Sequence, residues 1–112
     1  MAVMKIEEDF FSDRTEVMAD IASTGFWPTT YVSGASPELP LHYHDWDIIG
    51  YVIKGSTYLL DANGEQVAIG PGTRLTIPRG AWHAEGAATD NVTYIVTVAE
   101  PVPFTEALMP KE

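Results

Sequence analysis

Two stretches of the chain decide the fold: LHYHDWDIIGYVIKG at residues 41–55 and GTRLTIPRGAWH at residues 72–83. In the first, the run DIIGYVIK at residues 47–54 is apolar on both faces, which is typical of a strand covered on both sides. In the second, a Pro-x-Gly turn at residues 78–80 redirects the chain. The two stretches therefore predict buried strands that are joined by tight turns.

Other short strands are predicted around these stretches. The pair Asn63-Gly64 is the signal of a tight hairpin turn, and VTYIVTV at residues 92–98 is strongly β-branched. Strands are expected at residues 29–33, 47–54, 56–61, 66–69, 74–78 and 92–98. Because Gly and Pro separate these strands, and no helix of about 10–15 residues intervenes, the pattern favours an all-β sandwich or barrel.

A short helix is predicted near the N-terminus. Asp13 and Glu16 have the spacing of a capping box, and apolar residues follow at helical intervals, at positions 17, 18, 21 and 22. The helix is expected over residues 13–23, and a second short helix over residues 105–109. A chain of 112 residues has the size of one domain, so residues 1–112 are expected to form a single domain.

Composition narrows the range of partners. Six basic against sixteen acidic side chains give a formal charge of −10, which repels nucleic-acid backbones and anionic membrane surfaces. The absence of cysteine excludes disulfides and thiolate metal sites. The first residues lack the apolar core of a secretory signal, which predicts a cytoplasmic protein. We expect a small-molecule partner, with neither nucleic acid nor membrane.

The chain has three histidines, His42, His44 and His83. The first two are one residue apart, so on a strand they lie on one face about 6.6 Å apart. That spacing lets both rings bind one ion at nitrogen–metal distances of about 2.0–2.2 Å. The ordinary alternatives are a solvated strand edge for the pair and a half-buried ring for His83.

These residues resemble the two motifs of the cupin superfamily of small β-barrels. The first motif, His-x-His, three or four residues, Glu, six residues and Gly, is similar to residues 42–55. The second, Gly, five residues, Pro-x-Gly, two residues, His, three residues and Asn, matches residues 72–83 in every spacing. The resemblance covers residues 30–100. It implies a cupin-like β-barrel (a jelly roll, or double-stranded β-helix) with a short irregular or helical N-terminal extension.

The resemblance further implies a divalent transition metal held by His42, His44 and His83, and a homodimer. Zn, Ni, Fe and Mn all remain compatible with imidazole ligands. The family's glutamate falls on Ile48, which cannot coordinate a metal, and its asparagine falls on Ala87. No fourth ligand therefore stands at the usual place.

Two carboxylates are candidates for a role at this metal. Asp47 precedes Ile48 and points to the opposite face of a regular strand, so it would need a turn or bulge to reach the ion. Glu85 shares the face of His83 in a regular strand and is the candidate catalytic residue, as a general base or as a group that orients a ligand. For both, the ordinary alternative is a solvated surface carboxylate.

The strand after the first motif has two faces with different expected neighbours. Ile48, Gly50 and Val52 are expected on the inner face with the histidines, beside a set of inward residues: Tyr58, Leu60, Tyr94 and Val96. On the outer face, Ile49, Tyr51 and Ile53 need to be covered by another sheet or another subunit. The inner face predicts a largely apolar pocket with one polar focus.

The leading functional hypothesis is a metal-dependent small-molecule enzyme of the lyase, isomerase, cyclase or dioxygenase type. Its metal would polarise an oxygen-bearing substrate, and Glu85 or a metal-bound water would move protons. The alternative is a non-catalytic module that binds or senses a small ligand, which the missing glutamate favours. A third alternative is an interaction scaffold with a vestigial site.

Overall fold

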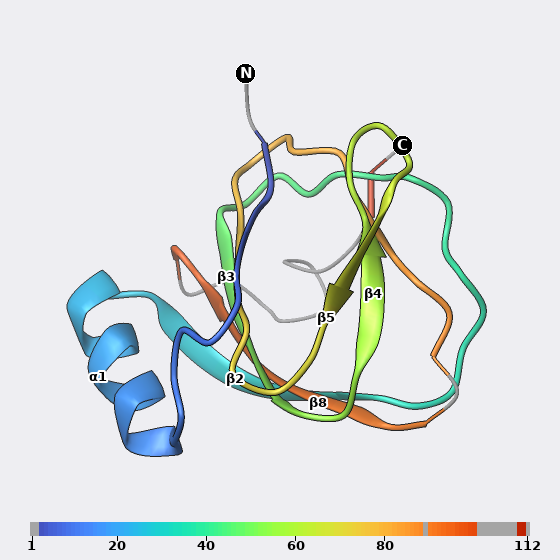
Figure 1. Ribbon diagram of the computed structural model, residues 1–112. Helices are drawn as coiled ribbons and strands as arrows, with labels where there is room; N and C mark the ends of the chain where they lie inside the picture. The colour runs from blue at the N-terminus through green and yellow to red at the C-terminus, as the bar shows by residue number, and fades with distance from the viewer. Residues whose placement is uncertain (1–2, 89, 101–109, 112) are drawn as a thin grey trace.

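The computed structural model describes residues 3–88, 90–100 and 110–111. The elements, in chain order, are β1 (Lys5–Glu7), α1 (Arg14–Thr24), β2 (Trp27–Ser33), β3 (Ile48–Lys54), β4 (Thr57–Leu60), β5 (Gln66–Ile69), β6 (Arg74–Ile77), β7 (Ala84–Glu85) and β8 (Val92–Val98). Paired strands run antiparallel throughout these ranges (Figure 1). The predicted all-β class is confirmed.

The strands form two sheets, a five-stranded one in the order β1-β6-β3-β8-β2 and a three-stranded one in the order β5-β4-β7. Strand β3 lies in the middle of the larger sheet, and its residues Ile48–Val52 are buried on both faces, as its apolar sequence predicts. Across the described residues no continuous ladder joins the two sheets, so the barrel is not closed by strand pairing. Isolated bridges at Ser36–Ala88 and His42–His83 pair the segments between the sheets.

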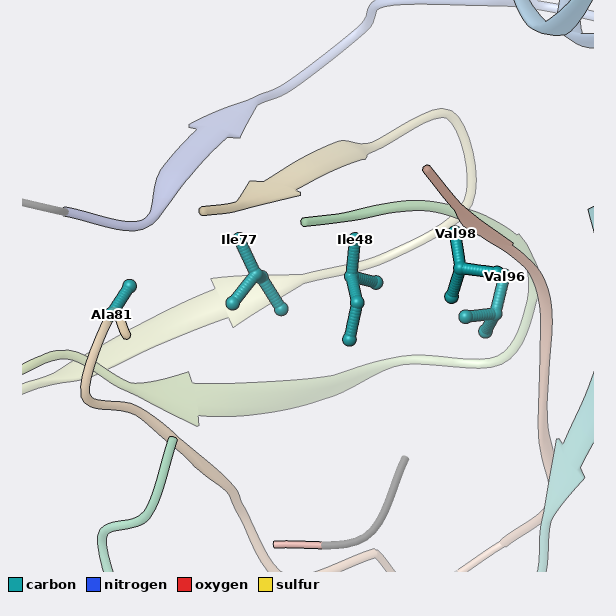
Figure 2. Packing of buried hydrophobic residues seen from close by; sticks show 5 residues of the cluster. All are labelled: Ile48, Ile77, Ala81, Val96 and Val98. Carbon is teal, nitrogen blue, oxygen red and sulfur yellow. The ribbon is translucent and has the colours of Figure 1, made fainter. Parts of the chain in front are cut away.

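The inner face of the larger sheet carries two groups of buried apolar side chains. One contains Ile48, Ile77, Ala81, Val96 and Val98, drawn from β3, β6, β8 and the turn after β6 (Figure 2). The other joins the two sheets and contains Val52, Leu59, Ile69, Leu75 and Val92. These contacts hold the sheets against each other and fix the position of β3.

The outer face of β3 is covered by helix α1 of the same chain (Figure 1). Val17 and Ile21 of the helix pack against a buried set on the sheet: Ile49, Tyr51 and Ile95. The prediction that another sheet or another subunit covers this face is wrong. The helix supplies the cover because its two buried side chains are four residues apart and therefore lie on one face.

Helix α1 begins and ends at the residues that its sequence signals indicate. The Asp13 side chain accepts a hydrogen bond from the Glu16 amide at 2.9 Å, which caps the first turn. Gly25 adopts a left-handed φ of 74°, and its amide donates to the Ile21 carbonyl at 3.0 Å. The observed bounds, Arg14–Thr24, agree with the predicted helix within one residue at each end.

A polar group, here called the clasp, ties the helix to the sheet. The Tyr51 hydroxyl donates to Asp20 Oδ2 at 2.5 Å, and Arg74 Nε donates to the same oxygen at 2.9 Å. Arg74 also donates to Glu7 of β1 at 2.9 Å. Burial raises the pKa of Tyr51 to about 12, assisted by its hydrogen bond to Asp20. The clasp thus joins α1, β1, β3 and β6.

The predicted strands 66–69 and 92–98 have the observed bounds of β5 and β8, and the others differ by one or two residues at their ends. Strands β1 and β7 are absent from the predicted set. The predicted helix at residues 105–109 lies outside the described residues. Within those residues, no helix is long and apolar enough to cross a membrane.

Candidate metal centre

The two histidine motifs meet through backbone pairing. The His42 amide donates to the His83 carbonyl at 2.8 Å, and the His83 amide donates to the His42 carbonyl at 2.9 Å. The Gly80 amide, in the turn before His83, donates to the His44 carbonyl at 3.0 Å. His42 lies in an isolated bridge before β3 rather than at the start of that strand. The direct pairing explains how residues 41 positions apart share one site.

The three imidazole rings lie in contact in the interior. Ring centroids are 4.8 Å apart for His42 and His83, and 5.1 Å apart for the pairs His42–His44 and His44–His83. The exposed fractions of His42, His44 and His83 are 2%, 4% and 1%. The ordinary reading of the pair as a solvated strand edge is therefore wrong.

Two of the rings are oriented by backbone carbonyls. His42 Nδ1 lies 2.9 Å from the Pro40 carbonyl, and His83 Nδ1 lies 3.0 Å from the Ala81 carbonyl. Since a carbonyl only accepts, each Nδ1 carries a hydrogen, and the neutral ring then has its lone pair on Nε2. Burial lowers the pKa of His83, which favours this neutral form. Its Nε2 is buried and makes no hydrogen bond with the part of the chain that the structure describes.

Glu85, on β7, completes the cluster. Its Oε2 lies 3.3 Å from His42 Nε2 and is itself buried with no hydrogen-bond partner. The ligand atoms of the three histidines and Glu85 all lie within 4.8 Å of one another. A neutral His42 with its hydrogen on Nδ1 directs a lone pair at a carboxylate oxygen, an arrangement that a bound cation or an added proton would stabilise. Three imidazoles and a carboxylate fit a divalent transition metal.

The other candidate acid, Asp47, is engaged elsewhere. Its Oδ1 accepts a hydrogen bond from the Arg79 amide at 2.8 Å, which links the first motif to the turn before His83. Asp47 is absent from the cluster of metal-ligating groups among the described residues. It holds the two motifs together, and the proposed route from Asp47 to the metal is not observed.

Two cavities meet at the histidines. The larger, about 310 Å³, has a mixed lining in which Ser33, Ser36 and Thr57 join His42 and His44, together with apolar residues such as Leu39 and Ala88. The smaller, about 80 Å³, lies among apolar side chains of β3, β4, β6 and β8. The predicted pocket with an apolar wall and one polar focus is therefore present.

The predicted inner wall is correct for β3 and β8 and wrong for β4. Ile48, Gly50, Tyr94 and Val96 line the smaller cavity as expected. On β4, the lining residue is Leu59, and neither Tyr58 nor Leu60 takes part. The Tyr58 hydroxyl instead donates to Glu38 at 2.7 Å. Successive side chains of a strand alternate between faces, so an error of one residue in the register exchanges the two sets.

Val52, which was also expected on this wall, packs in the core shared by the two sheets.

Tyr94 stacks on Tyr31 with ring centroids 6.1 Å apart and an interplanar angle of 24°. Burial raises the pKa of Tyr94 to about 12, so its hydroxyl keeps its proton at neutral pH. Tyr94 can therefore donate a hydrogen bond to a molecule bound in the cavity.

Comparisons with known proteins agree with this fold. The family model described as Cupin domain matches residues 29–99. The polyketide cyclase RemF of Streptomyces resistomycificus is similar at 28% identity and a TM-score of 0.56, over 70% of this chain and 57% of the cyclase. This chain therefore spans little more than half the length of that relative. No curated protein sequence matches the chain.

Two further structures are similar in fold. A DUF861 family protein of Thermotoga maritima is 20% identical with a TM-score of 0.61, over 85% of this chain and 98% of that protein. Acireductone dioxygenase of Bacillus anthracis, which has a cadmium ion in its active centre, is 15% identical with a TM-score of 0.64, over 97% of this chain and 83% of the dioxygenase. With the family model covering most of the chain, these findings establish that the protein belongs to the cupin family.

Proposed function

We propose that the chain is a metal-dependent enzyme that acts on a small oxygen-bearing molecule, with one divalent ion held by His42, His44 and His83. The observation that carries the proposal is the contact between His42 Nε2 and Glu85 Oε2, two buried atoms 3.3 Å apart. Neither atom has a hydrogen to donate when His42 is neutral. A divalent ion held by the three histidines would bind the His42 lone pair and stabilise the neighbouring carboxylate by its charge, and it would supply Lewis acidity at the junction of the two cavities.

Glu85 is proposed as the group that moves protons in the reaction. One of its oxygens lies beside His42, while 46% of its side chain is exposed, and the residue lines both cavities. A carboxylate in this position can take a proton from a bound molecule and exchange it with solvent. Tyr94, whose hydroxyl stays protonated, is placed to donate a hydrogen bond to the same molecule.

The site suits lyase, isomerase, cyclase and dioxygenase chemistry. A proton-transferring carboxylate beside a Lewis acid favours the first three, because each removes or relocates a proton next to an oxygen-bearing carbon. The similarity to the polyketide cyclase RemF supports the same choice. We therefore propose a cyclase, lyase or isomerase reaction, and place the dioxygenase type second.

Elemental analysis of protein purified without added metal tests the metal site. We expect about one equivalent of a transition metal in the wild type and loss of most of it in His42→Ala and in His83→Ala. Glu65→Gln, in the turn between β4 and β5, serves as a control that keeps its metal. Less than about a tenth of an equivalent in the wild type would contradict the proposal, because a site of this kind binds tightly.

One observation favours a second function, that of a module that binds a ligand without turning it over. Ile48 stands where the family's metal-binding glutamate is expected, and it is 4% exposed among apolar neighbours. For such a module, a small ligand raises the unfolding temperature of the metal-loaded protein and is recovered unchanged. Product formation from any ligand that gives this shift would exclude it.

The homodimer and the cytoplasmic location stay predictions. Because helix α1 already covers the outer face of β3, a dimer is not needed to bury that surface. Sedimentation of the purified protein at micromolar concentration tests the dimer: a species of twice the mass of 12.3 kDa is expected.

A further inference from the structure

The smaller cavity is lined mostly by apolar side chains. Its volume is about 80 Å³, and one wall consists entirely of apolar residues: Ile48, Gly50, Leu59, Leu75, Ile77 and Val96. The rest of the lining consists of Tyr31, His44, His83, Glu85 and Tyr94. Because most of the lining is hydrocarbon, apolar groups can be buried in this cavity favourably. We call it the inner chamber.

Ile48 makes this wall apolar. It pairs across the sheet with Ile77 of β6 and Val98 of β8, so a row of three branched side chains faces the chamber side of the sheet (Figure 2). Two residues on, Gly50 has no side chain, and the nearest atoms to a methyl group placed there would be those of Leu75 at 3.9 Å. Ile48 therefore contributes to the hydrocarbon surface of the chamber, and the absence of a side chain at Gly50 contributes to its depth.

The inner chamber adjoins the larger cavity at the proposed metal site. Four residues line both cavities, namely Tyr31, His44, Glu85 and Tyr94. The larger cavity is the polar side of this junction, with Ser33 and Ser36 in its wall. A molecule held at the junction thus has polar groups around one end and an apolar recess beside it.

We propose that the inner chamber receives the hydrocarbon end of the substrate, whose oxygen-bearing head lies at the histidine cluster. The volume equals that of roughly two or three water molecules at ~30 Å³ each, and a methylene group is of similar size. The substrate is therefore a chelating oxygen compound with an unbranched or singly branched apolar end of about three carbons. This inference rests on the proposed metal site.

Straight-chain alkyl hydroxamates test the inference, because their two oxygens chelate a divalent ion and their chain length can be varied. The full chain is loaded with Zn²⁺, and the Kd of each compound from acetohydroxamate to octanohydroxamate is measured by calorimetry. We expect the Kd to fall about fourfold per added methylene until about three are present, and then to stay level. The fourfold step is the ordinary gain for burying one methylene group.

Two variants change the depth of the chamber in opposite directions. Gly50→Ala adds a methyl group at ordinary contact distance, so the gain should stop one carbon earlier with acetohydroxamate affinity unchanged. Ile48→Val removes one methylene group, so the gain should extend one carbon further. Glu65→Gln, at the exposed turn between β4 and β5 and away from both cavities, is the control and should leave the whole series unchanged. Thermal unfolding confirms that each variant is folded.

The outcomes separate this inference from the proposed function. Acetohydroxamate binding that is metal-dependent but does not strengthen with chain length would overturn the chamber and leave the metal site standing. Gains that continue past five or six carbons and ignore Gly50→Ala would also overturn it, because the chain would then occupy the larger cavity. A protein that binds neither Zn²⁺ nor any hydroxamate would overturn both proposals.

Discussion

His42 Nε2 and Glu85 Oε2 lie 3.3 Å apart in the interior, and the Nδ1 atom of the same ring lies 2.9 Å from the Pro40 carbonyl. The backbone contact fixes the hydrogen on Nδ1, so the facing atoms are two acceptors whenever the ring is neutral. The contact between His42 and the Pro40 carbonyl therefore explains why a positive charge is favoured between the imidazole and the carboxylate. A metal ion bound at the histidines would remove the conflict, and without metal the conflict persists as long as no proton is added to the pair.

Glu85→Gln is therefore expected to have opposite effects on stability and on activity. The amide can donate to His42 Nε2, so in EDTA above pH 7 the variant should be as stable as the wild type or up to about 1 kcal/mol more stable. Metal content should persist, while turnover should fall about 100-fold or more. Chemical denaturation and elemental analysis check these expectations.

Glu65→Gln is the control for the Glu85 variant, because it makes the same change at an exposed turn. It should alter neither stability nor turnover. Loss of the metal in Glu85→Gln would show that the carboxylate is a required ligand, and it would contradict the assignment of Glu85 as the proton-moving group.

Tyr51→Phe tests the clasp between the helix and the sheet. The variant loses the hydrogen bond to Asp20 while Arg74 remains as a partner, so the free energy of unfolding should fall by about 1–2 kcal/mol. Tyr58→Phe removes an exposed hydrogen bond to Glu38 and is the matched control, with an expected loss below about 0.5 kcal/mol. Equal losses in urea titrations of the two variants would show that the hydrogen bond in the clasp stabilises the fold no more than an exposed hydrogen bond does.

Stability should decrease at alkaline pH because of two tyrosines. The folded-state pKa of Tyr51 and of Tyr94 is raised to about 12, whereas both groups titrate near 10 in the unfolded chain. The unfolded state then binds fewer protons between these values, so their contribution is complete below pH 10 and is lost as the pH rises toward 12. Absorbance at 295 nm should show two of the five tyrosines ionising late.

The Tyr51→Phe variant checks this assignment. It should leave one late-ionising tyrosine and a smaller loss of stability between pH 10 and pH 12. A titration in which all tyrosines ionise together near pH 10 would be inconsistent with the buried positions of both hydroxyls.

Ile48→Glu returns a carboxylate to the position where the family's motif has one. Without metal, the new group is buried beside Ile77 and Val98 and should lower the free energy of unfolding by about 3–5 kcal/mol. Saturating Zn²⁺ should raise the unfolding temperature of this variant by more than it raises that of the wild type. Ile48→Val, as control, should lose about 1 kcal/mol and respond to Zn²⁺ as the wild type does.

A smaller response of Ile48→Glu to Zn²⁺ than of the wild type would show that position 48 does not face the ion. Thermal unfolding with and without the metal provides the comparison for both variants.

Much of the fold could be predicted because its strands carry strong local signals. Strand β8 is a β-branched run and β3 is a continuous apolar run, and both lie where the sequence places them. The Asp13 cap and Gly25 define the helix in the same way. The role of the helix could not be predicted, because two apolar residues on a short helix do not indicate which surface they cover.

The sequence did not predict the features of the sheets that depend on a very short strand or on the register between strands. Strand β1 has three residues and, within the described ranges, pairs with β6 alone, so its sequence carries no strand pattern of its own. On β4, Leu59 lines the cavity wall in place of the expected Tyr58 and Leu60, so the strand presents the other set of alternate side chains to the cavity. Local preference does not fix such a register, which depends on pairing with β5 and β7.

The site was predictable in its residue types and less so in its geometry. The spacing of the histidines indicates convergence, but the mutual pairing of His42 with His83 depends on long-range contacts. The position of Glu85, two residues after His83, indicated a shared face, which the structure shows. The hydrogen bond from the Arg79 amide to Asp47 carries no sequence signal, because any of sixteen acidic side chains could have made it.

The central claim is that one ion occupies the space among the imidazoles at positions 42, 44 and 83. Crystals of protein purified without added metal, measured at the absorption edges of zinc, iron, nickel and manganese, test it most directly. We expect a single anomalous peak about 2.0–2.2 Å from one nitrogen of each ring. An anomalous map with no peak there, while the rings keep their positions, would contradict it.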